Sequence, residues 1–250
     1  MKNSFMLFSI LLSLLFTSFS LQAKCSDEAR AGVNWTGCDK SNLDLSGVDL
    51  QSAILRRVNF SNSDLSKARL QSADLTFAKL DNVKFIKARM EHARLNNTKM
   101  NQADFSFAVL DDARFSRANI KQTSFKSSRL NKTDFYEVQV EQGMFEDAQL
   151  EKANFSRAKL VGSNFVNINA TQAVFNQANL ESANFTNANL KGAKLIEASL
   201  LSVNFKQANL STASIQGSEI DGAIFDEAKL SSTIWVKYKR CRNGSVGVCN

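Results

Sequence analysis

The chain has 250 residues and a formal net charge of +7, from 31 Lys and Arg against 24 Asp and Glu. This balance excludes a strongly acidic surface of the kind that imitates DNA. The absence of proline agrees with a continuous β ladder, because each proline would remove a hydrogen-bond donor. The length indicates one domain, and no linker interrupts residues 42–235.

Residues 1–23 are expected to form a secretory signal peptide. Lys2 precedes an apolar run from Met6 to Phe16, and a more polar stretch ends at Ala23, after which cleavage is expected. A membrane anchor or an internal helix is the alternative, but the run is shorter than the ~20 residues that span a bilayer. The mature chain is therefore expected to lack a transmembrane segment and to be exported, periplasmic or secreted, in a Gram-negative bacterium.

Residues 24–41 are expected to form an N-terminal cap. Trp35 agrees with the repeat that follows, but Lys40 occupies the next position that should be apolar. The inward-facing pattern is therefore expected to begin only near Leu43 and Leu45. Such a cap would cover the open end of a repeat structure and prevent end-to-end association.

Residues 42–235 follow one count of five without insertion or deletion. Every fifth residue from Leu45 to Trp235 is a large apolar residue, in 39 consecutive units, with Ala170 as the one exception. Two positions earlier lies a smaller residue, mostly Ala, as in the sequence Ala-Asn-Phe at 153–155. A helix needs apolar residues every 3.6 positions and a strand every 2, so this spacing indicates a solenoid.

The repeated unit is a small residue, Asp or Asn, Leu or Phe, and two mostly polar positions, as in residues 73–77 and 183–187. It resembles the pentapeptide-repeat family, and the resemblance implies an all-β fold, the right-handed quadrilateral parallel β-helix. Phe recurs at every twentieth position from Phe85 to Phe225, so four units are expected to form one coil, with about ten coils in the stack. A second Phe column, at 115, 135, 155 and 175, is expected on the opposite wall.

All four cysteines lie outside the 39 units, two at each end: Cys25, Cys38, Cys241 and Cys249. An even number in an exported chain indicates disulfides. Opposite ends of a rod cannot meet, so the pairs Cys25–Cys38 and Cys241–Cys249 are expected. A zinc site is the alternative, but the spacing is unlike that of zinc knuckles and no His accompanies the cysteines. Residues 236–250 are expected to form a C-terminal cap, which resembles the terminal segment of exported family members.

No catalytic, cofactor or metal site is expected from the sequence. His92 is the single histidine, it falls on an outward position, and no nucleophile or orienting partner can be identified for it. Carboxylates recur directly before core residues, where they could form a metal ladder or an acid–base pair. Asn, Lys, Arg or Ser fills the same position elsewhere, so hydrogen bonding to turns is expected instead. These carboxylates include Asp44, Asp64, Asp74 and Asp104.

The coil length sorts outward residues into candidate binding surfaces. Lys67 and Arg69 lie twenty residues before Lys87 and Arg89, so the four are expected to form a basic patch near one corner. Phe77 and Phe107 fall on outward positions, where they could anchor a protein partner. The alternative for each is an ordinary solvated surface, since mixed charge and single exposed aromatics are common. Two further basic groups are Arg56, Arg57, Arg94 and Arg114 on the adjoining wall, and Lys237, Lys239, Arg240 and Arg242 in the tail.

The resemblance also implies a comparison with family members that bind DNA gyrase as DNA-shaped rods. A net positive, exported chain does not fit that activity, and no aromatic stacking platform favours nucleic acid. The sequence favours a non-enzymatic exported rod that acts as a protein–protein interaction or structural module, with an unidentified envelope protein as its partner. The alternative is a binder of an anionic cell-surface polymer, either a glycan or lipid head groups. Nothing in the sequence indicates an oligomeric state.

Overall fold

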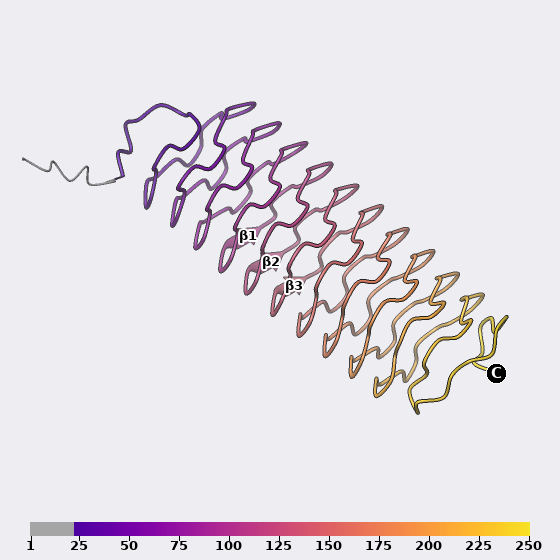
Figure 1. Ribbon diagram of the computed structural model, residues 1–250. Helices are drawn as coiled ribbons and strands as arrows, with labels where there is room; N and C mark the ends of the chain where they lie inside the picture. Colours follow the sequence, from indigo (N-terminus) through magenta and orange to yellow (C-terminus); the bar gives the residue numbers. More distant parts are fainter. Residues whose placement is uncertain (1–22) are drawn as a thin grey trace, which may run out of the picture.

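The computed structural model describes residues 23–250, which form a right-handed quadrilateral β-helix. Four-sided coils stack along one axis into a rod, and a short non-repeating segment lies at each end (Figure 1). The expected signal peptide falls on residues 1–22 and lies outside the described residues. Within residues 23–250 no helix has the length and hydrophobicity needed to cross a membrane.

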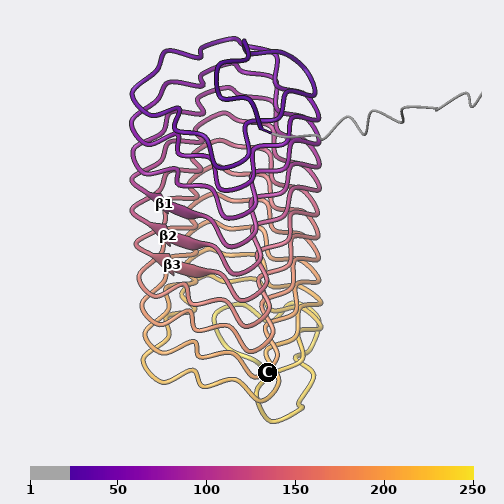
Figure 2. The ribbon, with the colours of Figure 1, turned by 90° about the vertical axis from the view of Figure 1, so that its left-hand side faces the viewer.

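The parallel bridges join residues that are twenty apart, which shows that each coil contains twenty residues. We name the four sides by their outward mid-side residues, in steps of twenty: wall A from 44 to 224, wall B from 49 to 229, wall C from 34 to 234, and wall D from 39 to 219. The longest strands lie on wall D and pair in parallel in the order β1-β2-β3 (Figure 2). They are β1 (Lys99–Asn101), β2 (Asn119–Lys121) and β3 (Gln139–Glu141).

Backbone hydrogen bonds tie every coil to both of its neighbours. The N–H of Asp104 donates to Val83 O in the preceding coil (2.9 Å), and the N–H of Phe105 donates to Ser124 O in the next (2.7 Å). At most corners, the second residue after the core residue has a positive φ, for example 60° at Lys67. This conformation turns the chain through the corner. Because it recurs every five residues, each unit of five residues forms one side of the coil.

Two columns of stacked phenylalanines fill the core, which confirms both columns expected from the sequence. Phe145 is fully buried between Phe125 and Phe165, with ring centroids 5.0 and 4.7 Å away. It also meets Phe155 of the opposite column edge-on at 5.9 Å. The small residues, mostly Ala, leave room for these rings. Burial of both columns along the rod supplies the hydrophobic free energy that holds the coils together.

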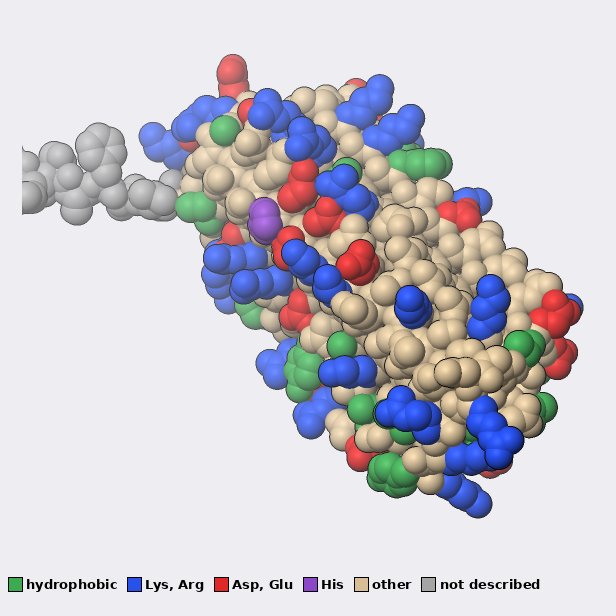
Figure 3. All heavy atoms as spheres, turned by 45° about the vertical axis from the view of Figure 1, so that its right-hand side comes forward, with side chains coloured by type: hydrophobic (Ala, Val, Ile, Leu, Met, Phe, Trp, Pro, Cys, Tyr) green, Lys and Arg blue, Asp and Glu red, His purple; other side chains and the backbone are tan. Residues whose placement is uncertain are grey.

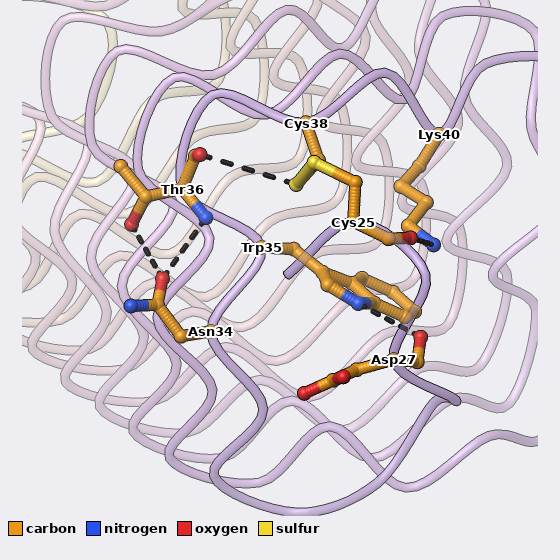
Figure 4. Close-up of a disulfide and its surroundings, with 7 residues drawn as sticks. All are labelled: Cys25, Asp27, Asn34, Trp35, Thr36, Cys38 and Lys40. Carbon is orange, nitrogen blue, oxygen red and sulfur yellow. Dashed lines mark hydrogen bonds between the residues drawn. A yellow bond between two sulfur atoms is a disulfide. The ribbon is translucent and has the colours of Figure 1, made fainter. Parts of the chain in front are cut away.

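Trp35 and a disulfide close the N-terminal end of the core (Figure 4). The indole of Trp35 is 1% exposed, and its Nε1 donates to Asp27 O (3.1 Å). The Lys40 ammonium lies 3.9 Å above the indole ring and donates to Cys25 O (2.7 Å). The Cys25–Cys38 disulfide holds the first residues of this segment against the coil.

The prediction that the inward pattern starts only near Leu43 is wrong. Val33 and Trp35 are already buried, and Asn34 pairs with Ile54 in the next coil. Lys40 is compatible with a core position here because its cation covers the indole at the open end, where no earlier coil packs. Leu43 itself is 42% exposed, because no preceding repeat covers its corner.

At the C-terminal end the chain reverses direction and folds back onto the last coil. Lys229 pairs antiparallel with Val246, and Ile234 pairs antiparallel with Arg240. Trp235 packs against Phe225, with ring centroids 5.0 Å apart. The Cys241–Cys249 disulfide closes this return, as expected from the sequence. The reversal supplies partners for strand edges that a parallel coil would otherwise leave open.

Candidate binding surfaces

The recurring carboxylates serve the turns, as predicted. Asp44, Asp64, Asp74 and Asp104 each accept the backbone N–H two residues on, at 2.8 to 3.0 Å. The hydrogen bond from the Ser46 backbone also holds the pKa of Asp44 below its usual value. Within residues 23–250, no group of three His, Cys, Asp or Glu side chains is placed to hold a metal ion.

His92 is exposed at the corner between walls B and C, with φ of 61°. It lines a hollow of about 400 Å³ on that corner and on wall C, which is formed by residues of four consecutive coils. The sequence correctly predicts that His92 points outward, but it contains no motif that groups His92 with the other residues of this hollow into one site. The other lining residues are Ser72, Arg94, Asp112, Arg114, Lys132 and Asp134.

The basic patch expected from Lys67, Arg69, Lys87 and Arg89 is brought together in space. Arg69 and Arg89 are bridge partners on wall B, and both lysines lie at the corner between walls A and B. Carboxylates offset part of its charge, since Arg69 pairs with Asp49 (3.4 Å) and Arg89 pairs with Glu91 (3.0 Å). The patch therefore carries less free positive charge than its composition indicates.

Phe77 and Phe107 are exposed, at 46% and 53%, but they do not form one surface. Phe77 lies at the corner of walls C and D, and Phe107 lies at the diagonally opposite corner of walls A and B. Each ring has a cation from the preceding coil over it, Arg57 at 5.7 Å and Lys87 at 5.9 Å. These contacts explain how an aromatic ring is accommodated at each corner without a partner.

The basic residues of the tail, Lys237, Lys239, Arg240 and Arg242, are all exposed. Two of them also hold the cap together. Lys239 donates to Cys249 O (3.2 Å), and Arg240 donates to Ser232 O (3.4 Å). Lys239 and Arg240 thus have a structural use, while Lys237 at the turn lies free of the ion pairs found in the described chain.

Charge is distributed unevenly along the rod. The three coils of residues 74–133, which we call the charged coils, contain 12 Lys and Arg against six Asp and Glu. The three coils of residues 154–213, the asparagine-rich coils, contain five Lys and Arg, two Glu and 11 Asn. On the face drawn in Figure 3, charged side chains gather toward the N-terminal end and again at the C-terminal end, and fewer of them lie between the two ends. The two regions present different surfaces on one scaffold.

Comparison with known proteins establishes the family but not a function. The chain is similar over 85% of its length to HetL, a pentapeptide repeat protein involved in heterocyst differentiation regulation from the cyanobacterium Nostoc sp. strain PCC 7120. That alignment has 24% identity, covers 93% of HetL and has a TM-score of 0.66. At 24% identity, it shows the fold alone.

Two further solved structures align with lower TM-scores. One is QnrB1, a plasmid-mediated fluoroquinolone resistance protein, with 16% identity over 72% of this chain and 90% of that one, and a TM-score of 0.33. The other is a pentapeptide repeat protein from the Arabidopsis thaliana thylakoid lumen, with 24% identity over 50% of this chain and 79% of that one, and a TM-score of 0.27. No curated protein matches the chain.

The family models match almost the whole repeat. The model for pentapeptide repeats of eight copies matches overlapping stretches from residue 31 to residue 165, and the model for the pentapeptide repeat region matches residues 152–225. These matches cover more than half of the chain. The protein therefore belongs to the pentapeptide-repeat family.

Proposed function

We propose that this protein is a non-enzymatic, exported rod that acts as a protein–protein interaction or structural module in the bacterial envelope. The observation that carries the proposal is the unbroken backbone ladder, in which bridges at twenty-residue spacing hold outward side chains in fixed register. A rigid surface loses little conformational entropy on binding, so it can present widely spaced contacts to a partner. The same rigidity suits a purely structural role.

Two observations support the envelope as the location. Both cysteine pairs are disulfide-bonded, and disulfides persist mainly in oxidising compartments. The N-terminal sequence from Lys2 to Ala23 also has the charge and hydrophobicity of a secretion signal. Fractionation of cells that express the full chain would test this location, because recovery of reduced protein with residues 1–23 retained would contradict it.

Site-specific photo-crosslinking in intact cells tests the interaction role. One coil offers an outward mid-side residue on each wall, and a second coil offers matched controls in the asparagine-rich coils. A partner that uses one wall should crosslink from one position of the set, and equal crosslinking from all four would contradict a defined interface. The first set is Lys84, Arg89, Arg94 and Lys99, and the second is Asn164, Asn169, Val174 and Asn179.

A second candidate function is binding of an anionic cell-surface polymer. The twofold excess of Lys and Arg over Asp and Glu in the charged coils favours it. Binding to a polyanion should weaken steeply as ionic strength rises, because at 0.15 M salt already screens most interactions between exposed charges that are more than about 8 Å apart. An apolar protein interface should be insensitive to the same change.

A further inference from the structure

Two arginines meet in register on wall C. The bridges run in parallel from Asp74 to Arg94, from Arg94 to Arg114, and from Arg114 to Asp134. Neighbouring strands lie about 4.8 Å apart, so the two side chains leave the backbone from adjacent rungs. Like charges directly opposite each other are unfavourable unless another group compensates them.

The carboxylates above and below are already engaged. Asp74 accepts the N–H and hydroxyl of Thr76 through Oδ1 and interacts with Arg56 through Oδ2. Asp134 accepts three hydrogen bonds, from the Tyr136 N–H and the Asn154 amide at Oδ1 and from the Ser116 hydroxyl at Oδ2. Neither Arg94 nor Arg114 has an ion pair or a side-chain hydrogen bond within residues 23–250.

The arginine pair on wall B provides an internal contrast. Arg69 and Arg89 are also bridge partners, but each has its own carboxylate, from Asp49 and Glu91. Each arginine of the wall B pair therefore has an ion pair, and among residues 23–250 neither arginine of the wall C pair has one. The geometry of the coil does not force this difference, since both pairs occupy equivalent positions.

Arg94 and Arg114 border the hollow described above, which supplies further polar groups. Lys132 adds a third cation, and His92 and Ser72 lie along the same corner. Asp112 contributes a carboxylate that forms no ion pair in the described chain, so it remains available as an acceptor. The hollow therefore combines donors suited to an oxyanion with an acceptor suited to hydroxyl groups.

We propose that this hollow binds an acidic sugar residue of an envelope glycan. Its carboxylate or phosphate group is held between Arg94 and Arg114, with Lys132 beside it, and a neighbouring hydroxyl donates to Asp112. Guanidinium groups match planar oxyanions through paired hydrogen bonds. The proposal rests on the second candidate function, binding of an anionic polymer.

An acidic sugar fits the hollow better than a membrane surface does. The negative charges of Asp112 and Asp134 would repel a sheet of anionic head groups, whereas a sugar brings a hydroxyl donor to Asp112. The lining contains no Phe, Tyr or Trp and only one smaller ring, that of His92, so it offers no extended platform for the successive bases of single-stranded nucleic acid.

The test is calorimetric titration of the disulfide-bonded mature chain with tetragalacturonic acid and, as a neutral control, maltotetraose. The Arg94→Gln/Arg114→Gln variant is compared with Arg69→Gln/Arg89→Gln, which removes the same charge from wall B. The wall C variant is expected to lose roughly tenfold or more in affinity for the acidic sugar, because charge-assisted hydrogen bonds are lost. The wall B variant should change affinity by less than about threefold.

Asp112→Asn separates a sugar site from a general anion site. This change should weaken binding of tetragalacturonic acid, because a neutral amide oxygen accepts a hydroxyl hydrogen bond more weakly than a carboxylate does. It should strengthen binding of inorganic polyphosphate, because a repulsive charge is removed. Stronger binding of both would overturn the assignment of a sugar. Equal losses in the wall B and wall C variants, equal binding of maltotetraose, or preferential binding to phosphatidylglycerol vesicles would also overturn it.

The glycan site and the protein-interaction module can be tested independently of each other. Wild-type protein that binds no acidic sugar, but crosslinks from one wall to a defined protein in cells, would overturn the glycan site and leave the interaction module supported. Acidic-sugar binding that is lost on Arg94→Gln/Arg114→Gln, without protein crosslinks, would support the glycan site and count against a protein partner.

Discussion

The charged coils and the asparagine-rich coils share one interior and differ at the surface. Phe105 stacks on Phe125 with ring centroids 5.1 Å apart in the first region, and Phe165 stacks on Phe185 at 4.7 Å in the second. The charged coils contain 18 charged residues and six Asn, against seven charged residues and 11 Asn in three coils of the other region. The fold therefore requires the core pattern and leaves the outward residues free.

In the asparagine-rich coils, uncharged side chains of adjacent coils hydrogen-bond to one another. On wall B, the Asn189 amide donates to Asn169 (3.2 Å), and the Asn209 amide donates to Asn189 (3.4 Å). Asn189 thus acts as both donor and acceptor between adjacent coils, so both ends of its amide are hydrogen-bonded within the rod. An arginine at an equivalent position needs an acid from elsewhere, which Arg69 has and Arg94 lacks. The charged coils depend more on residues outside the ladder, and so are the better candidates for binding.

The largest expected effect tests whether the two interiors are equivalent. Phe105→Ala and Phe185→Ala should each lower the free energy of unfolding by about 3–5 kcal/mol, because both rings are fully buried. Denaturant unfolding of the oxidised chain measures the loss. Phe107→Ala is the control, and its exposed ring should matter by no more than about 0.5 kcal/mol. A much smaller loss for Phe105→Ala than for Phe185→Ala would show that the two interiors are not equivalent.

The sequence predicted the interior well because its signal is redundant. A five-residue repeat that continues for 39 units is recognisable even where one unit departs from it, so the four-sided coil and both Phe columns could be expected. The two disulfide pairs could be expected because the cysteines lie at opposite ends of the rod. The ends were harder to predict. Lys40 interrupts the apolar count, yet its cation packs on Trp35, a contact that no pattern of hydrophobicity encodes.

The surface was predicted only as far as the twenty-residue register reaches. That register correctly placed Arg69 beside Arg89 and Arg94 beside Arg114. It could not show which pair has a free charge, because that depends on which way each carboxylate turns. Asp49 turns to Arg69, whereas Asp74 is engaged by Arg56 at the next corner. The sequence therefore predicts a basic patch that includes the wall B arginines, but it does not predict the hollow on wall C.

A smaller effect is expected at Gly143, between the two regions. Most units have Ala at this position, but a Cβ on Gly143 would overlap Val140 Cγ1 and lie 2.9 Å from Phe145 Cε2. Gly143→Ala should therefore destabilise by about 1–3 kcal/mol through overpacking. Thermal unfolding checks the loss, and the same change in a Val140→Ala background should cost less. An equal cost in both backgrounds would mean that the overlap with Val140 is not the cause.

A still smaller change in stability, which differs between walls B and C, is expected on replacing the arginine pairs. Arg94→Asn/Arg114→Asn should stabilise the rod by about 0.2–1 kcal/mol, because it removes like charges that face each other and form no ion pair. Arg69→Asn/Arg89→Asn should be neutral or slightly destabilising, since it also removes two exposed ion pairs. Melting temperatures at low and high salt measure both, and the gain on wall C should shrink as salt rises. Destabilisation by the wall C change would mean that Arg94 and Arg114 have a structural use.

The smallest effect concerns Glu137, just beyond the charged coils, and it appears as a dependence on pH. The Arg117 guanidinium, which donates to the Glu137 carboxylate (2.8 Å), lowers the pKa of that carboxyl, and Arg157 lies 3.9 Å away. A lowered pKa in the folded state means that the contribution to stability is present above the unfolded pKa, about 4.3 for Glu, and is lost as pH falls through the folded value. The melting temperature of wild type should therefore exceed that of Glu137→Gln at neutral pH, and the gap should close in acid. In an Arg117→Gln background the gap should be smaller at neutral pH and change less with pH, because the main partner of the carboxylate is gone. A gap that stays constant down to acidic pH would show that Glu137 contributes through packing, and that a single ion pair between rungs adds nothing measurable to a rod whose core and backbone ladder already fix its shape.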